Sequence, residues 1–458
     1  MVLHGNCVDA IPSVYIFAHL LYDASGTLVG MMYRTPSYAA NTFDVFWHEK
    51  KPPGDITAVY NSAGTKVTTY TYDDLGQLIS EVKGNTTLTY TYDNAGNITS
   101  ITSTTEQSGG GIPDPGFKPV IKAIINPSVV TTTNTLGYSN SQWGDLLTSY
   151  NGTAITYDGI GNPLSYYNGT SYTFTWEGRR LVGAVKGAKT MSFAYNDEGI
   201  RTSKTVNGVT TTYYVNGGQI VAESNNSRTI VYIYDVTGSP IGMMYRTPSY
   251  AANTWDVFWY EKNLQGDIIA VCNSEGTKLI SYNYSDAWGN YTVSYANGGG
   301  STGAIHNPFR YRGYYYDTDL SMYYLQSRYY DAKICRFISA DSYISTGQGM
   351  ISFNMFAYCN NNPVNYYDPC GDNLIELINE IIEKIKRFLN WATNASPEEI
   401  REDMGGSPAD GNTLGAAEPT ITNPGNFSHS IYYYNEGGGS HMVQSMYEDF
   451  YGVITWFD

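Results

Sequence analysis

Cysteine and histidine show no pattern in this sequence. The six histidines are scattered, and the cysteines form an odd set without Cys-x-x-Cys spacing: Cys7, Cys272, Cys335, Cys359 and Cys370. Disulfide frameworks and structural metal sites need paired or closely spaced ligands. The sequence therefore predicts isolated thiols, no metal site and no cofactor.

Long apolar runs and positive charge are also scarce. No stretch of 18 apolar residues occurs, so no transmembrane segment is expected. No Lys or Arg precedes the apolar stretch VYIFAHLL at 14–21, so the basic region of a signal peptide is lacking and no signal peptide is visible. The net charge is −16, with −9 of it in residues 374–458. This charge argues against nucleic acid as a partner of the main body, because such surfaces are basic.

Tyrosine and glycine are what the sequence has in abundance. It contains 44 Tyr and 47 Gly among 458 residues, and 42% of its residues are apolar. Tyrosine favours the pleated, half-buried surface of a sheet, and glycine supplies turns. The composition predicts a mainly β fold.

A short repeat organises most of the chain. TYDDLGQLIS at 71–80 returns as TYDNAGNITS at 91–100, and the form recurs near Tyr157, Tyr195 and Tyr234, with FTWEGRRL at 174–181 as a degenerate copy. The Asp side chain can accept a hydrogen bond from the backbone N–H two residues on. The Gly three residues after it can take the positive φ that closes a turn. With the Tyr stacked on its counterpart across strands, the repeat predicts antiparallel hairpins of about 20 residues lying side by side.

A longer duplication and an interruption complete this organisation. GMMYRTPSYAANTFDVFW at 30–47 matches residues 242–259 at 17 of 18 positions, which indicates duplication rather than a functional requirement. The Gly/Pro-rich stretch within 103–145 predicts a loop or insertion, with regular pairing resuming near Trp143. The predicted segments are repeat regions at 1–102 and 146–300, the insertion between them, a distinct segment at 301–372 and a tail at 373–458.

The distinct segment carries a family resemblance. It contains YYLQSRYYD at 323–331, RFISAD at 336–341 and YCNNNPVNYYDPCG at 358–371, in that order. The chain resembles bacterial Rhs/YD-repeat proteins, and this segment resembles the Rhs-repeat-associated core of polymorphic toxins of the Firmicutes type. The resemblance implies a spiral β shell, cocoon-like, that encloses a variable C-terminal toxin. Residues 1–372 are few for closing a cocoon alone, so an incomplete shell is expected.

The resemblance also implies a self-cleavage site. The family's boundary motif is P-x-x-x-x-D-P-x-G-L, and here Asp replaces the final Leu. Cleavage in the family follows that last position, which here is the bond between Asp372 and Asn373. The matching residues are Pro363, Asp368, Pro369, Gly371, Asp372 and Asn373.

Two carboxylates are the expected catalysts of that cleavage. A carboxylate pair that shares a proton can activate water and polarise a peptide carbonyl. The resemblance assigns one of the pair to Asp341 in the R-F-x-S-x-D motif, and the other to Asp317 or Asp319. Arg336 could orient a carboxylate through bidentate hydrogen bonds. Asp331 and Asp368 are interpreted as turn residues.

The tail predicts a different architecture. Residues 374–391 have apolar side chains at spacings of three and four, which indicates an amphipathic helix. The remainder is rich in Gly, Pro and Asn and is expected to be mostly irregular. No effector motif is recognised, so whether the chain is an enzyme stays open. An immunity protein is the partner expected for the tail, and carbohydrate or a further YD-repeat chain for the shell.

These observations lead to one main hypothesis and two alternatives. In the main hypothesis, the chain is the C-terminal part of a secreted Rhs polymorphic toxin of interbacterial competition. Its shell would hold a C-terminal effector and release it by aspartyl self-cleavage. The first alternative is a non-enzymatic cell-surface protein that binds carbohydrate or cell wall. The second is an inactive, truncated Rhs fragment.

Overall fold

The computed structural model describes residues 17–22, 28–34, 44–51, 55–107, 128–296, 305–343, 350–372 and 375–376, apart from short gaps at 62, 236–237, 252 and 264. For the strands before residue 55, and for 375–376, the description covers the backbone only. Strands dominate these residues, so the predicted mainly β fold is confirmed. Among the described residues, no helix has the length and apolar character needed to span a bilayer.

Two large antiparallel sheets make up the repeat region, and each follows the order of the chain. The first sheet contains β1 (Phe17–Tyr22), β2 (Leu28–Arg34), β3 (Asp44–Lys51), β4 (Asp55–Tyr60), β5 (Lys66–Tyr72), β6 (Leu78–Lys83), β7 (Thr86–Tyr92), β8 (Ile98–Gln107), β9 (Ser128–Gly137), β10 (Ser149–Tyr150) and β11 (Thr153–Ala154). The second contains β12 (Thr156–Tyr157), β13 (Pro163–Tyr167), β14 (Ser171–Glu177), β15 (Arg180–Lys186), β16 (Lys189–Tyr195), β17 (Arg201–Val206), β18 (Val209–Asn216), β19 (Gln219–Asn225), β20 (Arg228–Tyr234), β21 (Pro240–Arg246), β22 (Asp256–Lys262), β23 (Ile268–Cys272), β24 (Lys278–Tyr284) and β25 (Tyr291–Tyr295).

The segment after β25 has smaller elements. Four short strands form a third sheet: β26 (Tyr315–Asp317), β27 (Met322–Tyr324), β28 (Tyr329–Asp331) and β29 (Arg336–Phe337). Single-turn helices η3 (Tyr311–Gly313), η4 (Met350–Phe353) and η5 (Cys359–Asn361) precede and follow it. A last two-stranded sheet pairs β30 (Tyr366–Tyr367) with β31 (Ile375–Glu376).

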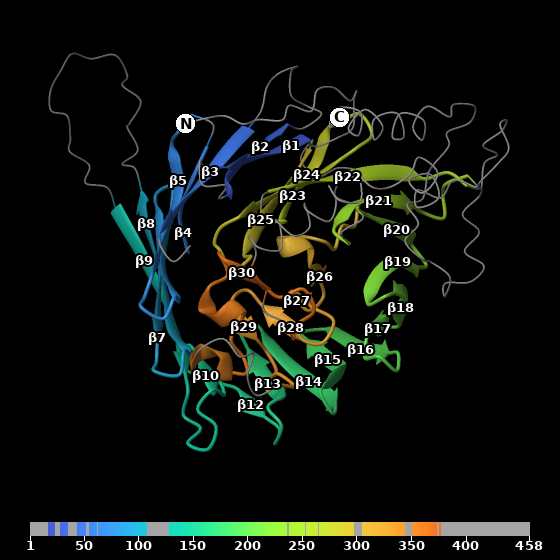
Figure 1. Ribbon diagram of the computed structural model, residues 1–458. Coiled ribbons are helices and arrows are strands. Elements are labelled where there is room, and N and C mark those ends of the chain that lie inside the picture. Colours follow the sequence, from blue (N-terminus) through green and yellow to red (C-terminus); the bar gives the residue numbers. More distant parts are fainter. Residues whose placement is uncertain are drawn as a thin grey trace, which may run out of the picture.

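The two large sheets curve around this segment (Figure 1). Among the described strands neither sheet closes on itself, because β1 does not pair with β11 and β12 does not pair with β25. Where the first sheet approaches the end of the second, the Ala287 N–H donates to Glu81 Oε2 at 2.9 Å. Beside this contact, Lys83 Nζ donates to the Tyr284 carbonyl, and the rings of Tyr90 and Trp288 lie 5.6 Å apart. We call this set of contacts the seam.

The repeat turns form as their sequence predicts. In the turn at 93–97, Asp93 Oδ1 accepts hydrogen bonds from the N–H groups of Ala95 and Asn97, both at 2.9 Å. Gly96 has φ +78°, the left-handed region that glycine adopts without strain. The same Asp bonds recur at Asp73 and Asp158. Each turn therefore closes through its own Asp and Gly.

The repeat tyrosines make a bond that their spacing does not predict. Five of them donate their hydroxyl groups to a backbone carbonyl at the start of an earlier strand. Such bonds are Tyr72–Ile56, Tyr92–Leu78, Tyr195–Leu181, Tyr234–Ile220 and Tyr284–Ile268, at 2.6–3.0 Å. In the degenerate copy, Trp176 Nε1 donates to the Pro163 carbonyl at 2.7 Å in the same manner. A ring with a polar tip can fill the inner face and still satisfy a buried carbonyl.

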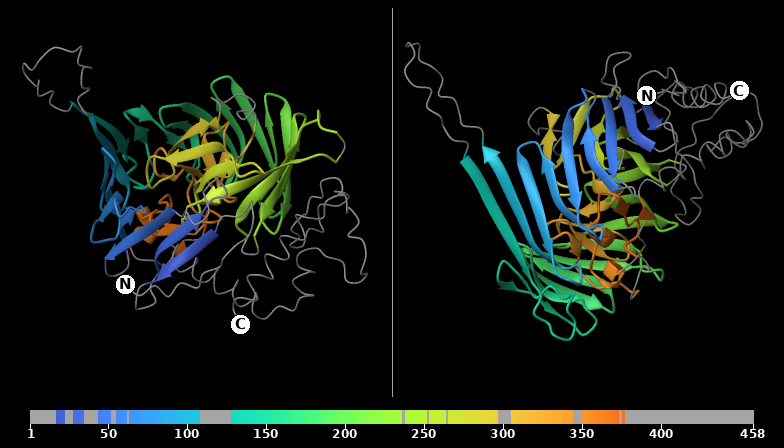
Figure 2. Two further views of the ribbon diagram at one scale, coloured as in Figure 1. Left: turned by 90° about the horizontal axis from the view of Figure 1, so that it is seen from above. Right: turned by 60° about the vertical axis from the view of Figure 1, so that its left-hand side comes forward.

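The predicted insertion at 103–145 contains regular structure. β8 extends to Gln107, and β9 begins at Ser128 and pairs with β8 along its length. Threonine side chains bond across this ladder, as between Thr102 and Thr133 at 3.0 Å. Figure 2 shows β8 and β9 as long strands at one side of the shell. The alternating β-branched residues of β8 and β9 explain this pairing. The residues between the two strands, 108–127, lie outside the described residues.

The start of the predicted tail helix is a strand. Ile375 pairs with Tyr367, and Glu376 with Tyr366, in β31 and β30. Pairing with the neighbouring tyrosine strand overrides the helical periodicity at these two positions. The rest of the predicted helix and the remainder of the tail, 377–458, lie outside the described residues.

Candidate functional site

The segment from 305 to 372, which we call the core segment, contacts the inside of the shell. One series of its bonds runs in reverse chain order, to shell residues that lie progressively earlier in the sequence, whereas Tyr323 and Tyr330 bond to Gly289 and Trp288, between β24 and β25 of the shell. The pairs of the series are Arg312–Asp267, Tyr315–Glu223, Asp317–Arg201, Asp331–Tyr166, Arg336–Tyr138, Asn361–Gln77 and Asn365–Ile56, at 2.6–3.0 Å. Because most of these side chains are buried, the contacts fix the core segment against the shell along its whole path.

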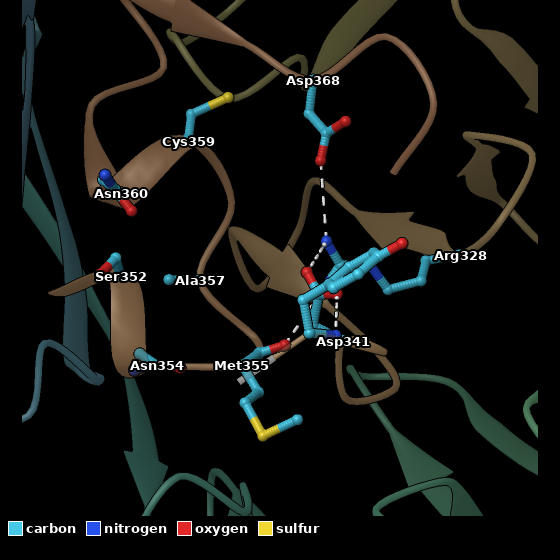
Figure 3. A pocket seen from close by; sticks show the side chains of 10 residues that line it. Arg328, Asp341, Ser352, Asn354, Met355, Ala357, Cys359, Asn360 and Asp368 are labelled. Atoms are coloured by element: carbon cyan, nitrogen blue, oxygen red, sulfur yellow. Dashed lines mark hydrogen bonds and ion pairs between the residues drawn. The ribbon is translucent and has the colours of Figure 1, made fainter. Parts of the chain in front are cut away.

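One buried guanidinium collects two carboxylates within this core segment. Arg328 Nη2 lies 2.7 Å from Asp341 Oδ2 and 3.6 Å from Asp368 Oδ2. All three residues are buried. Figure 3 shows Asp341 and Asp368 approaching Arg328 from different parts of the chain. The Arg328 guanidinium carbon also lies 3.6 Å from the centre of the Phe337 ring, which packs one face of the cation.

Asp368 is held by the turn that it forms. Its Oδ1 accepts hydrogen bonds from the N–H groups of Gly371 at 2.7 Å and Cys370 at 3.3 Å. The Asp368 N–H donates to the Tyr314 hydroxyl at 2.9 Å. The sequence predicts Asp368 as a turn residue, and the structure confirms that turn. The second oxygen of the same carboxylate faces Arg328, a contact that turn chemistry alone does not predict.

Asp341 is held by backbone groups of Tyr343 and Met355, which are not part of the Asp368 turn. Its Oδ1 accepts the Tyr343 N–H at 2.8 Å, and its own N–H donates to the Met355 carbonyl at 2.9 Å. Arg328 Nη1 donates to the same Met355 carbonyl at 3.1 Å. A cavity opens beside these groups, and its lining includes Arg328, Asp341 and Asp368 (Figure 3). Burial lowers the pKa of Arg328, and the Asp341 and Asp368 carboxylates oppose that effect.

Asp317 and Asp319 lie in a different cluster. Arg201 contacts Asp317 at 2.8 Å, and Lys204 contacts both aspartates at 2.9 Å. Lys189 binds Asp319 at 2.7 Å. Burial alone would raise the pKa of Asp317, but Lys204 and Arg201 hold it well below its usual range. These contacts tie the core segment to β17 of the shell, and they are separate from the contacts around Asp341.

Arg336 also has a different place from the predicted one. Its two terminal nitrogens donate to the Tyr138 hydroxyl and the Asp145 carbonyl, both at 2.6 Å. Its guanidinium lies 4.8 Å from the centre of the Phe356 ring. Arg336 therefore joins the core segment to the shell through neutral oxygens. The arginine that orients carboxylates is Arg328, whose signal in the sequence is its place in the SRYYD motif.

The other residues of the predicted cleavage motif lie on both sides of Asp368, and the Gly371 carbonyl among them accepts a hydrogen bond from Arg328 Nε. The Pro363 carbonyl accepts a hydrogen bond from Arg312 Nη2 at 2.6 Å. Asp372 follows the 368–371 turn, and burial raises the pKa of its carboxyl although Arg328 opposes this shift. Pro369 lies within the turn, and Asn373 lies outside the described residues. No group of three or more metal-ligating side chains gathers in the described part of the chain.

Comparisons with known proteins give relatives for part of the chain. No protein-family model matches it. Over 233 residues it is 34% identical to the tRNA3(Ser)-specific nuclease WapA of Bacillus spizizenii and 33% identical to the tRNA nuclease WapA of Bacillus subtilis strain 168. Each match covers 49% of this chain and 9% of the relative, so the chain matches only a small part of either relative.

Solved structures add a likeness in fold. A structure of the Photorhabdus luminescens Tc holotoxin pore with a TccC3 mutation matches 78% of this chain and 18% of the solved chain. The TM-score is 0.54 at 20% sequence identity, which shows the fold alone. The sequence similarity to WapA proteins and the fold shared with a Tc toxin chain together support an Rhs-type protein.

Proposed function

We propose that this chain is the shell and core of an Rhs polymorphic toxin that cuts itself after the core segment to free a C-terminal effector. One observation supports the proposal above all. Asp341 and Asp368 meet at Arg328, and Asp368 belongs to the turn that leads directly into the Asp372–Asn373 bond. Two acids and a cation thus lie beside Gly371 and Asp372, the residues that precede the bond marked by the motif.

The chemistry assigns a role to each group. One carboxylate of the Asp341–Asp368 pair takes a proton from water, which then attacks the carbonyl carbon of Asp372. Arg328 stabilises the negative charge that develops on the carbonyl oxygen. It already donates through Nε to the neighbouring Gly371 carbonyl. The amine of Asn373 leaves with a proton from the carboxyl group, so the pair returns to its starting state.

Asp317 and Asp319 have a structural role in this proposal. Arg201 and Lys204 neutralise Asp317, so its carboxylate is bound in place by residues of the shell. The catalytic pair is therefore Asp341 with Asp368, and Arg328 replaces Arg336 as the orienting residue. This pairing follows from distances that no spacing rule in the sequence supplies.

The released effector is the segment after Asp372. Its activity is not assigned, because the nuclease names of the WapA relatives describe those proteins and the matched part is small. Secretion or display at the cell surface, a role in competition between bacteria and protection by an immunity protein belong to the same proposal.

Two measurements test it. Intact-mass analysis of the purified full chain should show a fragment that ends at Asp372 and a second that begins at Asn373. Expression of residues 373–458 alone should stop the growth of a bacterial host. An uncut chain after prolonged incubation, together with a harmless tail, would overturn the proposal.

A further inference from the structure

A second turn of the core segment forms hydrogen bonds with the backbone just before the proposed cut. The turn at Leu325–Arg328 places Gln326 at φ +65°. Within it, Ser327 binds the Cys370 carbonyl twice, through its N–H at 3.1 Å and its Oγ at 2.7 Å. Arg328 Nε donates to the next carbonyl, that of Gly371. Two consecutive peptide carbonyls are therefore held by backbone and side-chain donors of one turn.

These hydrogen bonds require the Leu325–Arg328 turn to lie very close to the backbone of Gly371. Gly371 has φ +90°, and a Cβ at this position would lie 2.4 Å from Ser327 Oγ and 2.9 Å from the Leu325 carbonyl oxygen. No side chain fits there without moving the Leu325–Arg328 turn. The two turns thus lie in direct contact at Gly371, and a Cβ at this position would force them apart.

The chain is held again just after the proposed cut. β31 pairs with β30 in the register Tyr367↔Ile375 and Tyr366↔Glu376. The Asp372–Asn373 bond lies in the connection between these two strands. It is therefore flanked by the Ser327 and Arg328 bonds on one side and by a strand ladder on the other.

We propose that the Leu325–Arg328 turn and β31 act as a two-sided clamp that selects the Asp372–Asn373 bond for cutting. This inference rests on the proposed self-cleavage. Backbone contacts on both sides fix the distance between the bond and the carboxylates, so the side chain at 372 has little influence on where the chain is cut. Ser327 is a positioning residue in this scheme, because it holds a carbonyl and contacts no reacting atom.

Serine and aspartate variants test the clamp by the place of the cut. Ser327→Ala loses one of two bonds to the Cys370 carbonyl, so cutting should slow about 5–20-fold and fragments cut at neighbouring bonds should appear. The matched control is Ser274→Ala, an exposed serine in a shell turn, which should cut like the parent. Asp372→Asn should be cut at the same bond within about threefold of the parent rate, because its backbone contacts remain.

The strand side of the clamp has its own test. Ile375→Pro removes an N–H and disfavours the ladder, so it should also spread the cut over neighbouring bonds. Hydrogen exchange on the full-length Asp341→Asn chain gives a readout that needs no cutting, and amides of the 375–376 strand should exchange slowly. If the parent chain is not cut, the proposed function fails and the role of the clamp in cutting fails with it, and slow exchange of these amides then shows only that the β30–β31 ladder forms. If the parent is cut and both Ser327→Ala and Ile375→Pro leave its rate and position unchanged, the clamp is wrong.

Discussion

Asp341 and Asp368 share one guanidinium, that of Arg328, which lies 2.7 Å from the first carboxylate and 3.6 Å from the second. Buried charges are tolerated in proteins when they are paired and hydrogen-bonded, and here each carboxylate is also bound by backbone N–H groups. The arrangement is therefore stable at rest. It also places two acids beside the segment that the motif marks for cutting.

The Asp317 cluster should contribute to stability rather than to cutting. Asp317→Asn leaves the buried Arg201 without its charge partner and leaves Lys204 with Asp319 alone, so the free energy of unfolding should fall by about 3–5 kcal/mol. Urea unfolding followed by tryptophan fluorescence measures this loss. Asp319→Asn is the matched control, because its carboxylate is partly exposed and its removal should cost under about 1 kcal/mol. Equal losses in the two variants would contradict the anchoring role of Asp317.

Two glycines with the same backbone conformation separate turn strain from packing. Gly76 and Gly96 both have φ +78°, but a Cβ at Gly76 meets no atom within 4 Å. A Cβ at Gly96 would lie 3.2 Å from Ile351 Cγ2 and 3.3 Å from Asn361 Nδ2, both in the core segment. Gly76→Ala should cost about 1–2 kcal/mol from its backbone alone. Gly96→Ala should cost about 1–3 kcal/mol more.

Thermal and urea unfolding of both glycine variants give this comparison. A larger loss in Gly96→Ala shows that the repeat turn supports the core segment. The same loss in both variants would mean that the core segment adapts freely to the shell, against the fixed contacts described above.

The seam should weaken as the pH rises. Burial, followed by the nearby Asp286 carboxylate, raises the pKa of Glu81 from its ordinary 4.5 to about 8. The folded protein therefore binds a proton that the unfolded chain releases. This contribution to stability is complete below the ordinary pKa of Glu81 and is lost as the pH rises through about 8. The melting temperature should fall as the pH rises from about 4.5 to about 8 and then level off.

A glutamine variant assigns that pH dependence to the seam. Glu81→Gln keeps an oxygen for the Ala287 N–H but cannot ionise, so its melting temperature should vary less with pH than that of the parent. The exposed Glu106 provides the control, and Glu106→Gln should follow the parent curve. A Glu81→Gln curve as steep as the parent's would show that other groups cause the pH dependence.

The shell could be predicted largely from sequence because its signals are local. Each repeat turn closes through an Asp and a Gly three residues apart, as at Asp93 and Gly96. The tyrosine bonds were not predictable in the same way, because Tyr92 reaches the Leu78 carbonyl at the start of β6. Periodicity states which face a side chain takes and leaves open which distant atom it meets.

The site could be predicted only in part for the same reason. Motifs give Asp341 and the turn at Asp368, but their meeting depends on how the core segment folds back to Arg328. The family resemblance makes Asp317 a candidate catalytic acid. In the structure its carboxylate instead pairs with Arg201 and Lys204 of β17 in the shell. Charge pairing between segments far apart in the chain carries no signature in a single sequence.

A time course of intact mass on four purified full-length chains tests the central assignment most directly. The chains are the parent, Asp341→Asn, Asp368→Asn and Asp319→Asn, each checked for folding by its melting curve. The account predicts a fragment that ends at Asp372 in the parent and in Asp319→Asn, with cutting slowed by at least about 100-fold in the other two. Cutting that persists in Asp368→Asn but disappears in Asp319→Asn would contradict it.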